Sequence, residues 1–199
     1  MIQDLFKTPI YNTNLDIDNK LLETLAYQEK QKDNLGRTKS NNGYQTKDLD
    51  FQKYKFLFDE ISKHAIKFYS IYDANILSHY IGNFWINISG KHHYNRLHSH
   101  NGSFISGVYY IKIPKDSGGI VFENPSCMFI ENTFGNRNNW NNYNSPEWRI
   151  VPKEKQLLMF PSYLRHFVEQ NKSDEDRISL SFNLLINQWW KIIHLGIFI

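Results

Sequence analysis

The sequence predicts an α+β protein in which N-terminal helices pack against a β-sandwich or a small barrel. Two observations carry this prediction. Apolar residues recur at helical spacing in two segments before Asn75, and after it seven or so short alternating segments are separated by turn signals. With 199 residues, the chain is long enough for one domain with a sizeable core. We divide it into a mainly helical part, 1–75, a β-barrel part, 76–187, and an apolar tail, 188–199.

The first predicted helix covers residues 17–34, where Asp18 or Asn19 can cap its start. The second covers residues 50–74 and has the stronger pattern, with His64 beside its apolar stripe. We interpret His64 as a structural residue, because a lone histidine on a helix is far more often structural than a ligand. The apolar residues that define the two stripes are Leu21, Leu22, Leu25 and Ala26 in the first helix, and Leu57, Ile61, Ala65, Phe68 and Tyr72 in the second.

The strand predictions begin with a short strand in residues 4–11, ended by Pro9, and continue after Asn75. Alternation predicts strands in 78–90, 104–114 and 120–125, two short strands in 149–161, and two more in 166–187 around an acidic turn. Phe84 and Trp85 are assigned to the core. The Asn-rich segment 126–148 is too long for an ordinary connection. It is either a lid or substrate loop, with Trp140, Tyr143 and Trp148 as contact points, or a surface insertion.

Composition excludes several classes of protein. The net charge of +3 is small and spread thinly, which gives no support to nucleic-acid binding. Cys127 is the only cysteine, so no intrachain disulfide can form, and we expect a reducing, cytoplasmic location. The N-terminus does not read as a signal peptide, and no apolar run approaches the roughly 20 residues of a membrane span. The apolar tail is predicted to pack on the domain or, less favourably, to form an interaction patch.

Two histidines precede the strongest predicted strand. His98 and His100 are two residues apart, so on an extended strand their imidazoles point the same way and can converge on one ion. The best third ligand is His166, which stands where the strand QLLMF has ended and HFV begins. Three histidines with an open coordination position suit Fe(II), Zn(II) or another borderline metal. The alternatives are scattered, unrelated histidines, or a contribution from His92 or His93 in the preceding polar loop.

The last predicted strand has one apolar face and one polar face. Ile178, Leu180, Phe182 and Leu184 form the first, and Arg177, Ser179, Ser181 and Asn183 form the second. If the polar face points inward, the guanidinium needs an anion, because an unpaired buried charge is very costly. Arginine offers a carboxylate a bidentate pair of hydrogen bonds. The other interpretation is the solvent face of an edge strand.

Taken together, these residues resemble the 2-oxoglutarate/Fe(II)-dependent oxygenases. The set His98-x-His100, the strand GVYYI, the distal His166 and Arg177-x-Ser179 is similar to the prolyl-4-hydroxylase-like branch of that superfamily. The segments LFKTPIY, SNNGYQT, SGVYYI, LLMFPSYLRHFV and RISLSFN resemble a group of uncharacterised oxygenases from bacteria and phages, over about 5–183. The implied fold is a double-stranded β-helix, a jelly roll like that of the cupins, with helices packed against it.

The resemblance also implies roles for individual residues. His98 and His166 match metal ligands, Arg177 and Ser179 match the residues that bind the far carboxylate of 2-oxoglutarate, and Tyr110 matches a tyrosine that hydrogen-bonds it. His100 stands where most of the superfamily has Asp or Glu, so three histidines replace the usual two histidines and one carboxylate. The carboxylate could instead come from another residue, for which Glu123 is the first candidate.

The implied activity is hydroxylation by a dioxygenase that uses Fe(II) and 2-oxoglutarate, with ascorbate as a supporting reductant. The substrate is a small molecule or a protein side chain, neither nucleic acid nor membrane is implied, and a homodimer is left open. Two alternatives remain: a three-histidine, cupin-like metal enzyme that does not use 2-oxoglutarate, and a non-catalytic barrel that binds a ligand. Retention of both His166 and Arg177 favours the oxygenase over these alternatives.

Overall fold

The computed structural model of the protein describes residues 3, 5–37, 43–72, 78–126 and 139–187. The apolar tail 188–199 and residues 127–138 of the long loop therefore lie outside the described residues. No helix within these ranges is long and apolar enough to cross a membrane. The helices are α1 (Asn19–Lys32), η1 (Phe51–Tyr54), α2 (Lys55–Tyr69) and η2 (Ser70–Tyr72). The strands are β1 (Tyr11–Asn14), β2 (Tyr44–Gln45), β3 (Ser78–Ser89), β4 (Asn95–His98), β5 (Ile105–Lys112), β6 (Ile120–Glu123), β7 (Glu147–Ile150), β8 (Gln156–Pro161), β9 (His166–Val168) and β10 (Arg177–Asn187).

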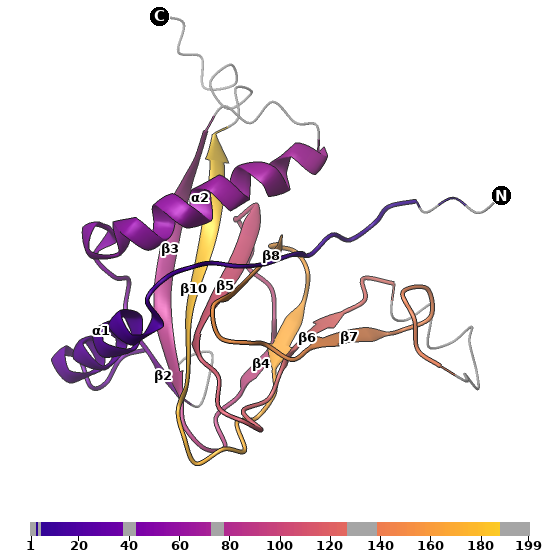
Figure 1. The fold of residues 1–199 in the computed structure, drawn as a ribbon. Coiled ribbons are helices and arrows are strands. Elements are labelled where there is room, and N and C mark those ends of the chain that lie inside the picture. The colour runs from indigo at the N-terminus through magenta and orange to yellow at the C-terminus, as the bar shows by residue number, and fades with distance from the viewer. Residues whose placement is uncertain (1–2, 4, 38–42, 73–77, 127–138, 188–199) are drawn as a thin grey trace, which may run out of the picture.

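These strands form two antiparallel sheets. The larger has the order β1-β8-β5-β10-β3-β2, and the smaller has the order β4-β9-β6-β7. β10 pairs with β3 on one side and β5 on the other, so it lies in the middle of the larger sheet. Helix α2 crosses β3, β10 and β5, with α1 beside them (Figure 1). The structure consists mostly of antiparallel β-sheets with few helices. This agrees with the prediction that helices pack against a β-structure.

The larger sheet separates two cores. Its first face packs against α1 and α2 through a cluster that includes Phe58, Ile86 and Leu180. Its second face packs toward the smaller sheet through a smaller cluster that includes Val108, Phe122 and Phe160. The predicted alternation of the last strand is therefore confirmed: Ile178, Leu180, Phe182 and Leu184 are fully buried on the helix side. The polar residues between them face the space between the sheets.

The helices agree with the prediction in part: Leu22 and Ala26 of the first stripe are buried but Leu21 is exposed, and the second predicted helix begins as the 3-10 helix η1 before α2. The Asp18 side chain accepts hydrogen bonds from the backbone N–H groups of Lys20 and Leu21, which caps α1. The stripe of α2 is buried from Leu57 to Phe68, whereas Tyr72, in η2, is 38% exposed. The Tyr11 hydroxyl and His64 Nδ1 are joined by a 2.8 Å hydrogen bond. His64 is thus a structural residue, as predicted.

Three strands differ from the prediction. The first strand is not in the apolar segment before Pro9; β1 begins at Tyr11 and runs through a polar segment. An edge strand needs no strict apolar alternation, because one of its sides is open to solvent, and β1 pairs only with β8. The two-residue β2 lies in a predicted loop and is too short to leave a pattern. β4 lies in the polar segment before His100 and is also an edge strand.

Candidate metal centre

Three histidines meet between the two sheets. His98 ends β4 and His166 begins β9, where the two residues lie directly opposite each other, with ring centroids 4.4 Å apart. The His100 ring lies 5.0 Å from that of His98 and 5.3 Å from that of His166. One ring nitrogen of each residue lies within 4.8 Å of the others. Among the described residues, no other group of three His, Cys, Asp or Glu side chains is arranged to hold a metal ion.

The convergence of His98 and His100 has a different origin from the one predicted. His100 is not on the strand with His98 but follows β4 in a turn. Its backbone N–H donates to the carbonyl of Ser162 at 2.9 Å, and its own carbonyl accepts a 3.4 Å hydrogen bond from Ser103. The spacing of two residues therefore brings the rings together through a turn anchored to the β8–β9 connection, and not through strand alternation.

Hydrogen bonds fix which ring nitrogen faces the centre. Nδ1 of His98 lies 2.7 Å from the carbonyl oxygen of Arg96, and Nδ1 of His166 lies 3.0 Å from that of Leu164. A carbonyl oxygen only accepts hydrogen bonds, so both Nδ1 atoms carry the proton when the rings are neutral. Nε2 of each ring then holds the free lone pair that a metal ion needs. This arrangement, with a backbone carbonyl behind each imidazole, is typical of metal-binding histidines.

Burial keeps two of the rings neutral. It is the main cause that lowers the pKa of His100 to about 4 and that of His166 to about 3, and the neighbouring His98 adds to both shifts. His166 is buried and His100 is half-buried. A neutral imidazole is the form that binds a metal. His100 and His166 can therefore bind a divalent borderline metal ion without first losing a proton.

The alternative ligands do not join this cluster. The carboxylate of Glu123 pairs with Arg165 at 2.7 Å and lines a different cavity. His92 is exposed in a turn, and Nδ1 of His93 accepts a hydrogen bond from the backbone N–H of Gly90 at 3.0 Å. Among the described residues, the candidate centre has three imidazoles and no carboxylate.

The histidines line a cavity of about 260 Å³ that also contains Arg177. Arg177 is 4% exposed, and its Nη1 donates hydrogen bonds to the carbonyls of Ser117 and, at 3.2 Å, of Glu169. No carboxylate in the described part of the chain forms an ion pair with it. Burial lowers the pKa of Arg177, but a guanidinium stays charged in proteins. A buried guanidinium that forms no direct ion pair with a carboxylate can bind an anion.

Two hydroxyl groups accompany Arg177. Ser179 on β10 and Tyr110 on β5 are directly opposite each other, and both line the cavity. Burial raises the pKa of Tyr110 far above its ordinary value, so its hydroxyl remains a hydrogen-bond donor. The structure therefore brings all six predicted site residues to one cavity: His98, His100, His166, Arg177, Ser179 and Tyr110.

That β3 also lines the histidine cavity was not predicted from the sequence. Phe84 is in the core as predicted, but Trp85 lines the cavity, with its ring 5.9 Å from that of His100. Asn83 and Asn87 line the cavity from the same face of β3. The signal was present in the sequence, because Asn83, Trp85, Asn87 and Ser89 alternate with apolar residues as the polar face of β10 does.

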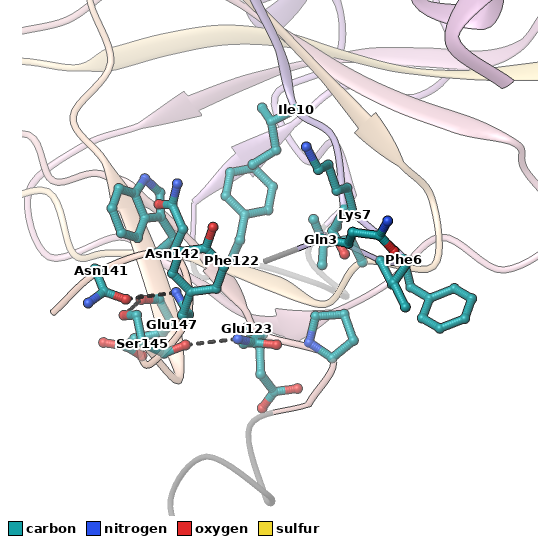
Figure 2. Close-up of a pocket in the computed structure, with 17 residues that line it drawn as sticks. Gln3, Phe6, Lys7, Ile10, Phe122, Glu123, Asn141, Asn142, Ser145 and Glu147 are labelled. Atoms are coloured by element: carbon teal, nitrogen blue, oxygen red, sulfur yellow. Dashed lines mark hydrogen bonds between the residues drawn. The ribbon is translucent and has the colours of Figure 1, made fainter. Parts of the chain in front are cut away.

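A second, larger cavity of about 610 Å³ lies on the other side of Phe122. The N-terminal residues Gln3 and Lys7 face Asn141 and Asn142 across it (Figure 2). Tyr143 and Trp148, which we expected to contact substrate, line this second cavity and not the one that contains the histidines. The prediction that these two residues contact the substrate is therefore not supported, because neither lines the histidine cavity.

Comparison with known proteins identifies the family. Residues 83–183, just over half of the chain, match the sequence model of a family described as "Putative 2OG-Fe(II) oxygenase". The chain belongs to this family. The oxygenase is thus an oxidoreductase that uses Fe(II) and 2-oxoglutarate, as the resemblance implied. The candidate centre lies within the matched residues, and its imidazole donors fit Fe(II). A comparison with curated protein sequences finds no match.

Solved structures share the fold of this oxygenase. A prolyl-4-hydroxylase from Pseudomonas putida is 12% identical, covering 93% of this chain and 96% of that one, with a TM-score of 0.62. The viral collagen prolyl hydroxylase of Paramecium Bursaria Chlorella virus-1 is 15% identical over 88% and 94%, with a TM-score of 0.57. The epimerase SnoN of nogalamycin biosynthesis, in complex with Fe3+ and alpha ketoglutarate, is 11% identical over 89% and 79%, with a TM-score of 0.62. At these identities the likeness concerns the fold.

Proposed function

We propose that His98, His100 and His166 hold the Fe(II) ion of this oxygenase, and that Arg177, with Ser179 and Tyr110, holds 2-oxoglutarate. One observation supports this assignment above all. A set of three convergent imidazoles and a buried guanidinium without a counter-ion line the same cavity of about 260 Å³. The metal site needs the first set, and a dicarboxylate needs the second. A cupin-like enzyme that does not use 2-oxoglutarate would leave the guanidinium of Arg177 without an anionic ligand.

Each residue has a defined task in this proposal. The three imidazoles bind iron through the Nε2 atoms of His98 and His166 and through one ring nitrogen of His100. Arg177 fixes the far carboxylate of 2-oxoglutarate by charge and hydrogen bonds, and the two hydroxyl groups orient it. Bound iron and 2-oxoglutarate supply oxidation of a substrate by O₂, with release of succinate and CO₂. The apolar side chains of Val108, Ile120 and Phe160 limit water in the cavity.

The cavity lining bears on the substrate. Arg37 and Arg177 line it, and no acidic residue is among the described lining residues. In this proposal the anionic 2-oxoglutarate is already paired with the metal ion and with Arg177. A cationic group of the substrate would find no acidic side chain among the described lining residues, so we propose that the part of the substrate that enters the cavity is neutral or anionic. Carboxamides of Gln45, Asn87 and Asn95 offer it hydrogen bonds.

We also propose that the fold is a double-stranded β-helix of the jelly-roll type. Two facing antiparallel sheets, with the site between them and helices on the outer face, support this proposal. The single domain, with its division at 75 and 187, and the cytoplasmic location inferred from the single cysteine remain predictions. So does the choice between a small-molecule and a protein side-chain substrate, and the homodimer.

The test is turnover of 2-oxoglutarate without substrate. The protein is mixed with Fe(II), ascorbate and 2-oxoglutarate in air, and succinate is measured. We expect slow succinate formation that is lost in His166→Ala and retained in His93→Ala, a histidine outside the cluster. If succinate formation persists in His166→Ala, His166 is not a ligand of the metal ion. Metal binding without any 2-oxoglutarate binding would favour the cupin-like alternative.

A further inference from the structure

Four polar side chains form a hydrogen-bonded row across the larger sheet. Asn183 on β10 donates from Nδ2 to Oδ1 of Asn83 on β3 at 2.8 Å. Ser106 on β5 donates to Oδ1 of Asn183 at 2.7 Å, and its Oγ also lies 2.8 Å from Oγ of Ser162, which follows β8. We call these four residues the polar row. It extends through the wall of the histidine cavity from one strand to the next.

Strand register places the polar row. Asn183 lies directly opposite Asn83 on one side and Ser106 on the other. Ser106 lies opposite Phe160, the residue two positions before Ser162. Ser106, Ser162 and Asn183 are 1%, 0% and 5% exposed. Buried hydroxyl and carboxamide groups must be paired, and here they are paired with each other. The row is therefore a continuous buried network that links four segments of the chain.

The row ends on the turn that holds two of the candidate metal ligands. The Ser162 carbonyl accepts the backbone N–H of His100 at 2.9 Å, and the Ser162 N–H donates to the carbonyl of Phe104 at 3.1 Å. Two residues later, the Leu164 carbonyl accepts from Nδ1 of His166 at 3.0 Å. The Leu164 N–H donates to the Pro161 carbonyl at 2.9 Å, which closes the turn. One turn thus fixes the backbone of His100 and the ring of His166.

We propose that Ser162, held by Ser106 and Asn183, positions His100 and His166 for the metal ion. The backbones of His98 and His166 are both held by the β4–β9 ladder, so for His166 only the orientation of the ring depends on the turn, through the Leu164 carbonyl. His100 lies in a turn, outside any strand, so its place depends on Ser162. Without the hydroxyl of Ser162, the turn keeps its backbone hydrogen bonds but loses its side-chain link to Ser106 on β5 and, through Ser106, to Asn183 on β10. The two rings then sample a wider range of positions, and the three nitrogen atoms converge less often.

The test uses Co(II), whose absorption spectrum reports the geometry of its ligands. This inference rests on the proposed metal centre, so wild type and His166→Ala are titrated first. If wild type binds no Co(II), or His166→Ala binds it as wild type does, the metal centre itself is wrong. With the centre established, we expect Ser162→Ala to bind Co(II) about tenfold more weakly and with an altered spectrum, at a pH where wild type binds fully. Unchanged affinity and spectrum would overturn the positioning role.

A matched control separates positioning from stability. Ser145→Ala removes another buried hydroxyl, which donates to the carbonyl of Glu147 and lines the second cavity, not the one that contains the histidines. We expect it to lower the thermal midpoint while leaving Co(II) affinity and spectrum unchanged. If Ser162→Ala does not fold, Asn83→Ala is used to test the positioning role instead. Asn83 is only half-buried at the far end of the polar row, so its replacement is better tolerated. A spectral change with about threefold weaker binding supports the inference, and wild-type Co(II) binding overturns it.

Discussion

His98 and His166 lie directly opposite each other on β4 and β9, and each directs its Nδ1 proton to a backbone carbonyl. Two candidate ligands are thereby fixed by a β-ladder, with their Nε2 atoms free. The third ligand, His100, comes from a turn. We infer that the site combines two ligands whose backbones are held in a ladder with one whose backbone lies outside any strand, which makes His100 the most informative residue to change.

The first prediction concerns His100. His100→Ala should bind Fe(II) at least about tenfold more weakly, because one of three ligands is lost. His100→Asp should bind Fe(II) more tightly than His100→Ala, because a carboxylate completes the ligand set that is usual for non-haem iron. Anaerobic titration with Fe(II) measures both. His93→Ala serves as the control and should bind like wild type. If His100→Ala also binds like wild type, His100 is not a ligand.

The second prediction concerns Arg177. Arg177→Ala should weaken 2-oxoglutarate binding by about tenfold to a hundredfold, since charge-assisted hydrogen bonds contribute about 1.5–3 kcal/mol. Metal affinity should be unchanged, because Arg177 is not one of the three proposed metal ligands. Equilibrium titration of the metal-loaded protein with 2-oxoglutarate measures the effect. Arg165→Ala is the control, because its guanidinium is 56% exposed and pairs with Glu123 outside the cavity. Equal 2-oxoglutarate affinity in all three proteins would contradict the assignment.

Much of the site could be predicted because strand alternation is local. Arg177, Ser179 and Ser181 alternate with apolar residues in the sequence, and one face of β10 carries them into the cavity. The same pattern is present in β3, but Trp85 was predicted to be a core residue together with Phe84. The burial of Trp85 is real, at 9% exposed, but it lies against His100 on the cavity side.

Other features depend on contacts that no local pattern records. His100 reaches its place through a hydrogen bond to Ser162, which is distant in sequence. The edge strand β1 has a polar sequence because only β8 pairs with it, so its strand character comes from the partner. The prediction that His98 and His100 converge was confirmed, while its reason, alternation on a single strand, was wrong.

The third prediction concerns the close packing of β5 on β10. A Cβ atom at Gly107 would lie 2.3 to 2.8 Å from three ring atoms of Phe182, which is fully buried. Gly107→Ala should therefore lower the free energy of unfolding by about 1–3 kcal/mol. Phe182→Leu removes the ring, so the double variant should be less destabilised than the sum of the single variants. Urea unfolding of the four proteins measures the coupling, and simple additivity would show that the ring can move away at no cost.

The fourth prediction concerns acid stability. Arg149 donates from Nε to both carboxylate oxygens of Glu169 at 2.9 Å, and this pairing lowers the pKa of Glu169 below its ordinary 4.5. The folded protein thus binds this proton more weakly than the unfolded chain. The resulting stabilisation is complete above pH 4.5 and is lost as the pH falls through the lower, folded pKa.

Glu169→Gln removes this contribution, so its stability should fall less steeply than that of wild type below pH 4.5. Chemical unfolding midpoints measured from neutral pH into the acid range provide the comparison. Asp16→Asn, which removes a fully exposed carboxylate, is the control variant. The Glu169 carbonyl also accepts a hydrogen bond from Arg177, so acid should loosen the segment that orients the guanidinium. Identical acid slopes for wild type and Glu169→Gln would show that the Arg149 pair does not stabilise the folded protein.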